Sequence, residues 1–396
     1  MIPNGPLSLE SSNQSQEDID RLGIIVLAAM SFLPMIGRGN ILRLMLMAGL
    51  VCQQMVLKRY RIAPEIRRIL VMMVASAIIP AVVVFVFEGG ISFSFWAHEF
   101  IRILFYCMLI PVVYNYRITP EFLFKVCVVV LAMNFGIQFM QWRGIGNING
   151  WIYQYYAPKD AKFTHLVLAT YEGASFRAGS VFLNPNICMV VPCTILGVLL
   201  QRNSIEYNIW NYVWIGVALF SVLLTGSRTA FILSMIIVVF CTWKDKKAGK
   251  IKWLLPVILV LGLLMNASSL GNFRAFDVES AMHSSGHTKI SGILAYLQIT
   301  NLIYMVTGCC GSQLVFGLDN EWGYIYMFYG ILGLIWYISF LRLFQRNKEV
   351  LPLQTLATTW VSCLIACTAT VFLCMPICSF FCAVALPQYI SNKTIV

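Results

Sequence analysis

Charged residues are scarce in this sequence. Asp, Glu, Lys and Arg make up 11% of its 396 residues, whereas hydrophobic residues make up 59%. Water-soluble domains carry about 25% charged residues. The composition therefore excludes a soluble globular domain and predicts an all-α, polytopic integral membrane protein.

Several motifs of nucleotide and metal chemistry are absent. The sequence contains no Walker A loop, no GxGxxG and no HExxH, and its four histidines do not stand at ligand spacing from its cysteines. All of the 13 cysteines except Cys309 and Cys310 lie in or beside apolar runs, and Cys374, Cys378 and Cys382 share one helical face. We interpret these thiols as small residues of helix packing, and we expect no cofactor and no metal.

Apolar runs of about 17 to 25 residues each predict a membrane-spanning helix. We expect about twelve such helices (about eleven to thirteen), at 22–37, 41–57, 69–87, 98–116, 122–142, 181–200, 208–224, 229–243, 253–268, 322–341, 355–371 and 373–390. Residues 1–21 are polar and lack a basic n-region, which indicates a cytoplasmic tail rather than a signal peptide. Residues 22–396 then form a single transmembrane domain.

Basic residues gather in every second short connection between these helices, on one side of the membrane, and such connections face the cytoplasm. They are Arg21, Lys58, Arg59, Arg61, Arg67, Arg68, Arg117, Lys125, Arg202, the run "KDKKAGKIK", Arg342, Arg346, Lys348 and Lys393. Both termini are therefore predicted to be cytoplasmic, and the net charge of +11 reflects topology and contact with membrane lipids rather than nucleic-acid binding. The long loops 143–180 and 269–321 face outward, and the apolar segment 290–310 is expected to lie on the outer surface. The alternative is that this segment spans the membrane, which would invert the orientation of everything after it.

Four of the cations on this outer side are Arg177, Arg228, Arg274 and Lys289. Arg228 stands where two apolar runs meet, in "LLTGSRTAFIL", and an arginine at membrane depth costs at least ~2.5–3.5 kcal/mol. One reading is an arginine that reaches lipid phosphates at the membrane surface. The other is that the four cations converge on an anionic ligand such as a lipid-linked pyrophosphate, which arginine binds in a bidentate manner.

Two further groups of polar residues stand at expected helix starts. Asn184 and Asn186 flank a proline, which is ordinary helix N-cap chemistry, with sugar contact as a further role for their side-chain amides. His98, Glu99 and Arg102 predict a local ion-pair cluster.

Three motifs occur in a fixed order: "FRAGSVFLNPNICMVV", then "LLTGSRTAFIL", then, after a long loop, "LDNEWGYIYMFYGILGL". Their order and spacing, over roughly residues 170–345, resemble the O-antigen polymerase (Wzy) and O-antigen ligase superfamily. The resemblance implies a lipid-dependent glycosyltransferase fold of the GT-C-like kind in the bacterial inner (plasma) membrane, with a periplasmic active site. It implies an undecaprenyl-pyrophosphate-linked oligosaccharide as substrate, no nucleotide or metal, and a polysaccharide chain-length regulator as partner.

Transfer of such a glycan builds negative charge on the departing pyrophosphate, which preorganised cations stabilise. Arg228 fits this role, Arg177 and Arg274 would hold the remaining phosphates, and Lys289 would add charge. The acceptor hydroxyl needs a base or hydrogen-bond acceptor. The residues considered for it are Asp319 and Glu321 first, then His283 and His287.

Asp319 also bears on the choice between the two activities of the superfamily. Ligases typically carry histidine before the loop-closing asparagine, and here that residue is Asp319, in "LDNEW". This favours a polymerase, which joins lipid-linked repeat units, over a ligase, which transfers the polymer to lipid A–core. A lipid-linked sugar flippase is the alternative from another class, but the internal repeat common in transporters is not visible.

Overall fold

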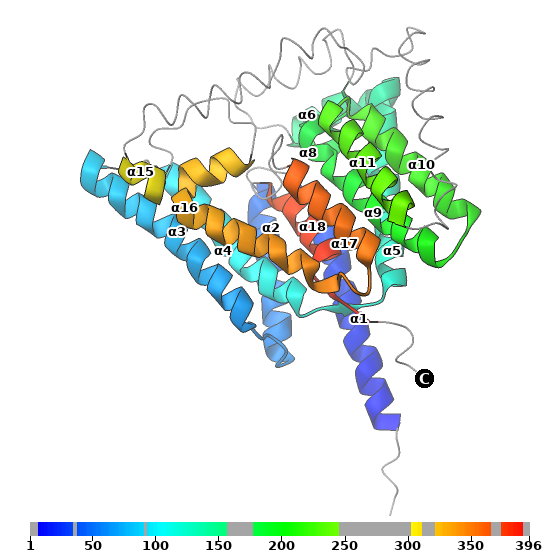
Figure 1. Cartoon of the computed structure of the whole chain (residues 1–396), viewed down its shortest axis with the longest axis horizontal. Coiled ribbons are helices and arrows are strands. Elements are labelled where there is room, and N and C mark those ends of the chain that lie inside the picture. Colours follow the sequence, from blue (N-terminus) through cyan, green and yellow to red (C-terminus); the bar gives the residue numbers. More distant parts are fainter. Residues whose placement is uncertain are drawn as a thin grey trace, which may run out of the picture.

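The computed structural model describes residues 7–34, 38–90, 93–156, 177–244, 302–310, 321–365 and 374–390. These residues are mostly helical (Figure 1), as the sequence predicts. The long helices are α1 (Leu7–Met30), α2 (Arg38–Val56), α3 (Pro64–Glu88), α4 (Phe93–Tyr114), α5 (Pro120–Arg143), α9 (Val190–Ile205), α10 (Ile209–Leu224), α11 (Arg228–Lys244) and α16 (Glu321–Leu343).

The remaining elements are short. They are α6 (Ile148–Tyr156), α8 (Pro185–Cys188), α15 (Leu302–Thr307), α17 (Pro352–Trp360), α18 (Met375–Ala385), the 3-10 helices η1 (Ile145–Asn147), η2 (Ser180–Phe182) and η5 (Phe344–Asn347), the π-helix η6 (Val361–Ile365), and the strands β1 (Arg117–Ile118) and β2 (Gln388–Tyr389). The two strands pair in parallel over two residues each. The last expected span therefore ends in extended backbone rather than in helix.

Five helical segments among the described residues are long and apolar enough to cross a membrane. They are Pro64–Glu88, Trp96–Tyr114, Pro120–Arg143, Pro185–Ile205 and Glu321–Asn347, and four shorter apolar helices accompany them. The expectations of twelve spans and of a GT-C-like fold are thus not met by the described residues, and the span expected at 253–268 lies outside them. Length is the physical reason: α18 has 11 residues, about 16 Å of helix against a hydrocarbon core of about 30 Å.

Local sequence signals explain where the long helices begin and end. Helix α5 follows Thr119, whose side chain accepts a hydrogen bond from the Phe122 amide, and Pro120 fills the first helical position. Its C-terminus is closed by Gly144 at φ 65°, and α3 is closed in the same way by Gly89 at φ 71°. Both glycines adopt the left-handed conformation that the C-cap requires.

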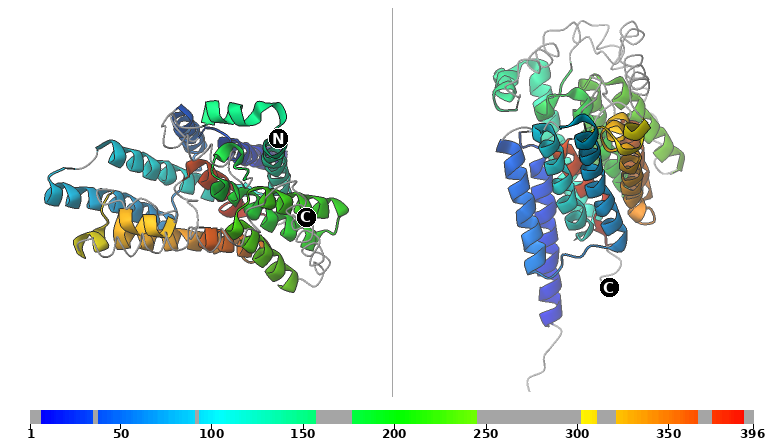
Figure 2. Two further views of the ribbon diagram at one scale, coloured as in Figure 1. Left: turned by 90° about the horizontal axis from the view of Figure 1, so that it is seen from above. Right: turned by 90° about the vertical axis from the view of Figure 1, so that its left-hand side faces the viewer.

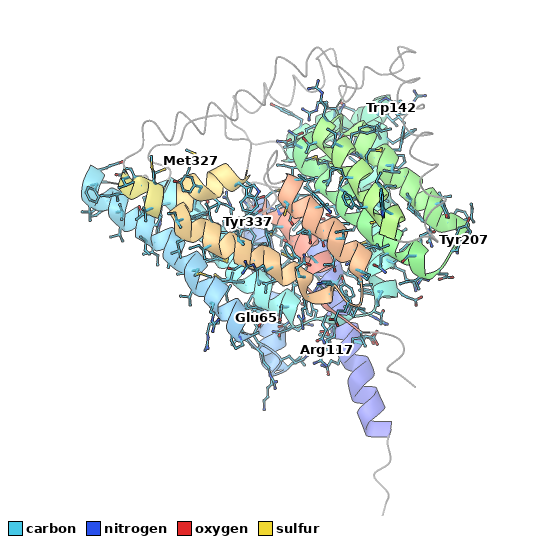
Figure 3. All side chains as sticks on the ribbon, in the orientation of Figure 1. Glu65, Arg117, Trp142, Tyr207, Met327 and Tyr337 are labelled. Carbon is cyan, nitrogen blue, oxygen red and sulfur yellow. The ribbon has the colours of Figure 1, made fainter. Side chains whose placement is uncertain are left out.

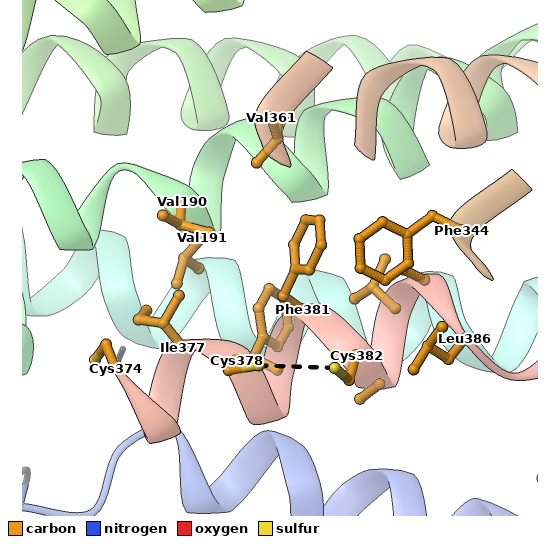
Figure 4. Packing of buried hydrophobic residues seen from close by; sticks show 14 of the residues in the cluster. Val190, Val191, Phe344, Val361, Cys374, Ile377, Cys378, Phe381, Cys382 and Leu386 are labelled. Atoms are coloured by element: carbon orange, nitrogen blue, oxygen red, sulfur yellow. Dashed lines mark hydrogen bonds between the residues drawn. The ribbon is translucent and has the colours of Figure 1, made fainter. Parts of the chain in front are cut away.

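Helix α18 lies at the centre of the bundle (Figure 2), where it packs against α1, α4 and α9. All of its residues are buried. Its Cys378 and Cys382 thiols lie 3.8 Å apart on one face (Figure 4), as the spacing predicts, and Phe381 packs edge-on against Phe344. The helices α3, α4 and α16 lie on one side of this centre, and α5, α9, α10 and α11 lie on the other (Figure 1).

Helix α16 is not one straight span, in contrast to the expectation for 322–341. Gly330 has φ 64° and ψ −157°, a conformation reserved for glycine. The ring distance between Trp322 and Tyr337 shows that the chain folds back there. The two rings lie only 4.8 Å apart, whereas a straight helix would separate them by about 22 Å. The amide of Cys309 bonds to the Met327 carbonyl, at 2.8 Å, and so ties the segment after α15 to the first arm of α16.

The connections that carry most basic residues meet at one end of the bundle. Arg59 forms a bidentate pair with Asp20 at 2.9 Å, and Asp20 also accepts from the Arg117 amide. Arg346 donates to the Tyr114 carbonyl at 2.8 Å. Figure 3 places Arg117 at this end and Trp142 at the opposite end. The expected grouping of helix ends is therefore present in the structure, while the side of the membrane that each end faces stays a prediction.

Candidate functional site

The first two sequence motifs meet in space. The Ala178 amide donates to the Leu224 carbonyl at 2.8 Å, and Arg177 Nε donates to the Thr225 carbonyl at 3.4 Å. Ala178 and Leu224 are both fully buried and pack with Trp142 at the end of the bundle opposite the basic connections. The turn that leads into Arg228 therefore lies directly beside Arg177.

The segment between Arg177 and α8 is a tight and strained turn. Ser180 and Leu183 have φ values of 50° and 61°, which non-glycine residues rarely adopt. A Cβ on Gly179 would lie 2.6 Å from the Leu183 carbonyl oxygen, so only glycine fits there. Gln141 on α5 fixes the turn by accepting from the Ser180 amide at 2.9 Å. Such local strain is typical of functional turns that the surrounding structure holds in place.

Asn184 and Asn186 have different roles in this turn. The Asn184 side chain accepts from the Asn186 amide at 2.8 Å and caps α8, and Pro185 is the first helical residue, which confirms the N-cap interpretation. Asn186 Oδ1 accepts from Arg177 Nη2, also at 2.8 Å. The "NPN" motif thus begins a helix and also orients the arginine that precedes it.

Arg228 is the first residue of α11 and is half-buried. Ser227 precedes it, and its hydroxyl accepts from the Ala230 amide at 3.4 Å, as a helix N-cap does. The N-terminus of a helix carries partial positive charge, which disfavours a cation by about 0.3–1 kcal/mol. An arginine at this position therefore opposes local helix stability.

The arrangement favours binding of an anion. The Asn186 and Thr225 oxygens that accept from Arg177 are neutral and orient its guanidinium. Arg228 and the amino end of α11 add positive potential at the adjacent turn. Oriented arginines beside a helix N-terminus match the geometry with which proteins hold phosphate groups.

Other residues predicted for this site cannot be placed. The described ranges do not include Arg274, Lys289, Asp319, His283 and His287. Their convergence on the two arginines stays a prediction.

Glu321 lies within the described residues but not at an exposed helix mouth. It is the first residue of α16 and is fully buried, and its side chain interacts with Tyr337 on the second arm of the same helix. The fold-back at Gly330 brings these two side chains together. Glu321 is therefore not a solvated residue, while its role as the base stays a prediction.

A second buried polar cluster lies on α4 and the first arm of α16. Arg102 and Glu99 form an ion pair at 2.8 Å, which confirms the local ion pair that the sequence predicts. The Tyr329 hydroxyl donates to the same Glu99 oxygen at 2.9 Å, and His98 Nδ1 lies 3.9 Å from the other oxygen. Tyr329 was not predicted, because it is far from Glu99 in sequence and only the fold-back of α16 brings it there.

Arg43 on α2 is a further buried charge that the sequence reasoning missed. It has no exposed surface, its Nε donates to the Met30 carbonyl at 3.2 Å, and Nη1 donates to Asn40 at 2.7 Å. Its second terminal nitrogen donates to the Leu33 carbonyl. The signal was present, since an arginine within an apolar run is unusual. Here the guanidinium satisfies the carbonyls released where α1 ends.

A comparison of the chain with protein-family models and with curated proteins finds no match. The resemblance to the polymerase and ligase superfamily therefore depends on the three motifs alone.

Proposed function

We propose that this protein is an O-antigen or oligosaccharide repeat-unit polymerase, a glycosyltransferase that uses undecaprenyl-pyrophosphate-linked glycans. The observation that carries the proposal is the contact between the "FRAGS" and "TGSRT" motifs, where Arg177 hydrogen-bonds to the turn that presents Arg228. These motifs are about 50 residues apart in sequence, and both supply an arginine to one end of a helical bundle. An anionic group bound there would contact both guanidinium groups.

The proposed reaction breaks the bond between the anomeric carbon of the growing glycan and its pyrophosphate carrier. The hydroxyl of the terminal sugar on a single lipid-linked repeat unit forms the new glycosidic bond and loses its proton to a base. The electron pair of the broken bond leaves with the pyrophosphate, and Arg177 and Arg228 stabilise the resulting charge. The energy of the reaction is already stored in the sugar–phosphate bond.

The proposal includes a specific setting. The chain would cross the bacterial inner membrane several times, with the arginine site facing the periplasm. Asp319 would act on the acceptor hydroxyl, in the position where ligases carry histidine.

The test is a substitution series at Arg228, scored by the length distribution of O-antigen chains in a strain that lacks the native gene. Arg228→Lys keeps a positive charge but loses the planar fork that binds two phosphate oxygens. We expect Arg228→Lys and Arg228→Gln each to lower the rate of chain extension, by about 10²–10³ for the loss of a preorganised donor. Arg67→Lys, an exposed arginine at the opposite end, is the matched control and should extend chains normally.

The outcomes separate the alternatives when membrane levels of the variants are equal. Normal ladders from both Arg228→Lys and Arg228→Gln would contradict the proposed role and indicate that Arg228 contacts lipid phosphates at the membrane surface. A deletion strain that makes core with one repeat unit supports a polymerase. Bare core with accumulated lipid-linked polymer would instead identify a ligase.

A further inference from the structure

A cavity of about 510 Å³ lies at the basic end of the bundle, where α3 begins and where α4 and α16 end. Figure 3 marks its position by the label of Glu65. It is far in sequence from the Arg177–Arg228 turn and at the opposite end of the helices. Its lining residues are Glu65, Arg68, Ile69, Met72, Tyr114, Ser339, Arg342, Leu343 and Arg346.

The cavity has an excess of positive charge. Three arginines and one glutamate line it, which leaves a formal charge of +2. Glu65 accepts a hydrogen bond from the Tyr114 hydroxyl. Arg346 is held by the Tyr114 carbonyl at 2.8 Å and by Gln388 at 3.3 Å, and its guanidinium lies 3.8 Å from the centre of the Tyr114 ring.

The other two arginines that line the cavity are Arg68 and Arg342. Within the described ranges, neither Arg68 nor Arg342 forms a hydrogen bond, an ion pair or a ring contact, although both line the cavity. They come from different helices, α3 and α16, which pack against each other. Two guanidinium groups with free donors on facing helices can hold one phosphate group between them.

The walls of the cavity add a second property. Ile69, Met72 and Leu343 supply apolar surface between the arginines and the hydrophobic part of α3. Exposed apolar side chains continue along α3 beyond the cavity, at Val71, Ile78, Ile79, Val82, Phe85 and Val86. A free anion would use only the arginines, whereas a phospholipid would place its phosphate on the arginines and its acyl chains along α3.

We propose that this cavity binds a phosphate group, and that the group belongs to the headgroup of an anionic membrane phospholipid. Basic pockets between transmembrane helices at a cytoplasmic surface are suited to such headgroups. Bound lipid would bridge the ends of α3 and α16. The inference does not depend on glycosyl transfer.

The test uses the purified full-length protein, with affinity measured by the rise in its thermal unfolding midpoint. Three conditions are compared. The protein is mixed with micelles that contain phosphatidylglycerol, with micelles that contain phosphatidylcholine, or with inorganic phosphate and no added lipid. We expect phosphatidylglycerol to raise the midpoint more than the other two. The double substitution Arg68→Gln with Arg342→Gln should weaken the apparent affinity for phosphatidylglycerol about thirtyfold, from two lost charges near the surface.

Two controls keep the result interpretable. Arg67→Gln removes an exposed charge next to the cavity but not in its lining, and it should leave the lipid effect nearly intact. If the double variant does not fold, Ser339→Trp fills the cavity without removing charge, and it should abolish the lipid effect. A wild-type response to phosphatidylglycerol in the double variant or in Ser339→Trp would overturn the proposal. An equal response to inorganic phosphate would overturn the assignment to a lipid.

Discussion

The buried ion pair between Glu99 and Arg102 allows a quantitative prediction about stability. Both side chains are nearly inaccessible, with exposed fractions of 3% and 10%, and their closest atoms lie 2.8 Å apart. Glu99→Gln preserves the shape and can still accept from Tyr329, but it leaves the Arg102 charge unbalanced. Removal of one partner of a buried pair costs about 3–5 kcal/mol, so we expect a loss of that size in the free energy of unfolding.

A double-mutant cycle isolates the pair from other effects. Arg102→Gln should be similarly destabilising, since it leaves the Glu99 carboxylate buried without its cation. The double variant with Gln at both positions has no buried charge left from this pair, so its loss should be smaller than the sum of the two single losses by about 0.5–3 kcal/mol. The measurement is reversible unfolding in detergent micelles, titrated with sodium dodecyl sulfate and followed by tryptophan fluorescence.

An exposed ion pair in the same chain supplies the matched control. Arg21 and Glu17 are 2.7 Å apart, nearly the same distance, but their side chains are 40% and 31% exposed. Glu17→Gln should therefore cost less than about 1 kcal/mol. If Glu99→Gln cost no more than Glu17→Gln, or if the losses at Glu99 and Arg102 simply added, then burial would not make this pair important and the reasoning would be wrong.

Two further predictions concern Gly330 in α16 and Cys310 in the segment that follows α15. Gly330→Ala should lower stability by about 1–3 kcal/mol or more, because φ is 64° there and a Cβ would collide with the Val306 carbonyl oxygen. Gly49→Ala, where a Cβ meets no atom within 4 Å, should be tolerated, and equal thermal midpoints for the two variants would contradict this. Burial raises the pKa of the Cys310 thiol to about 12. At neutral pH the fraction present as reactive thiolate should therefore be about a thousandfold lower than for a thiol with the ordinary pKa. Maleimide should label exposed Cys52 far faster than Cys310, and comparable rates, read by mass spectrometry, would show that Cys310 is accessible.

Features determined by neighbouring residues could be predicted from the sequence. The cap at Asn184, the proline start of α5 after Thr119 and the ion pair between Glu99 and Arg102 all involve residues at most four positions apart. The apolar runs also locate most described helices, because burial in lipid or protein requires continuous apolar stretches.

The fold-back of α16 could not be predicted in this way. Its sequence is apolar on both sides of Gly330, and a glycine is tolerated within a membrane helix. What selects the unusual backbone is contact with a distant segment, where the Gly308 backbone packs directly against Gly330. The burial of Glu321 and its contact with Tyr337 both follow from this turn, so they could not be predicted either.

The arginines show why a functional assignment needs tertiary contacts. Arg43, Arg102 and Arg177 all stand in or beside apolar runs, and residue type alone does not separate them. Arg102 is paired with a carboxylate and Arg43 satisfies the carbonyls at the end of α1, so both have structural partners sufficient to explain their burial. Arg177 donates to oxygens on two separate motifs and lies beside the turn that leads into Arg228. Under the proposed function this turn would hold the pyrophosphate, so loss of a guanidinium there should affect chemistry more than stability.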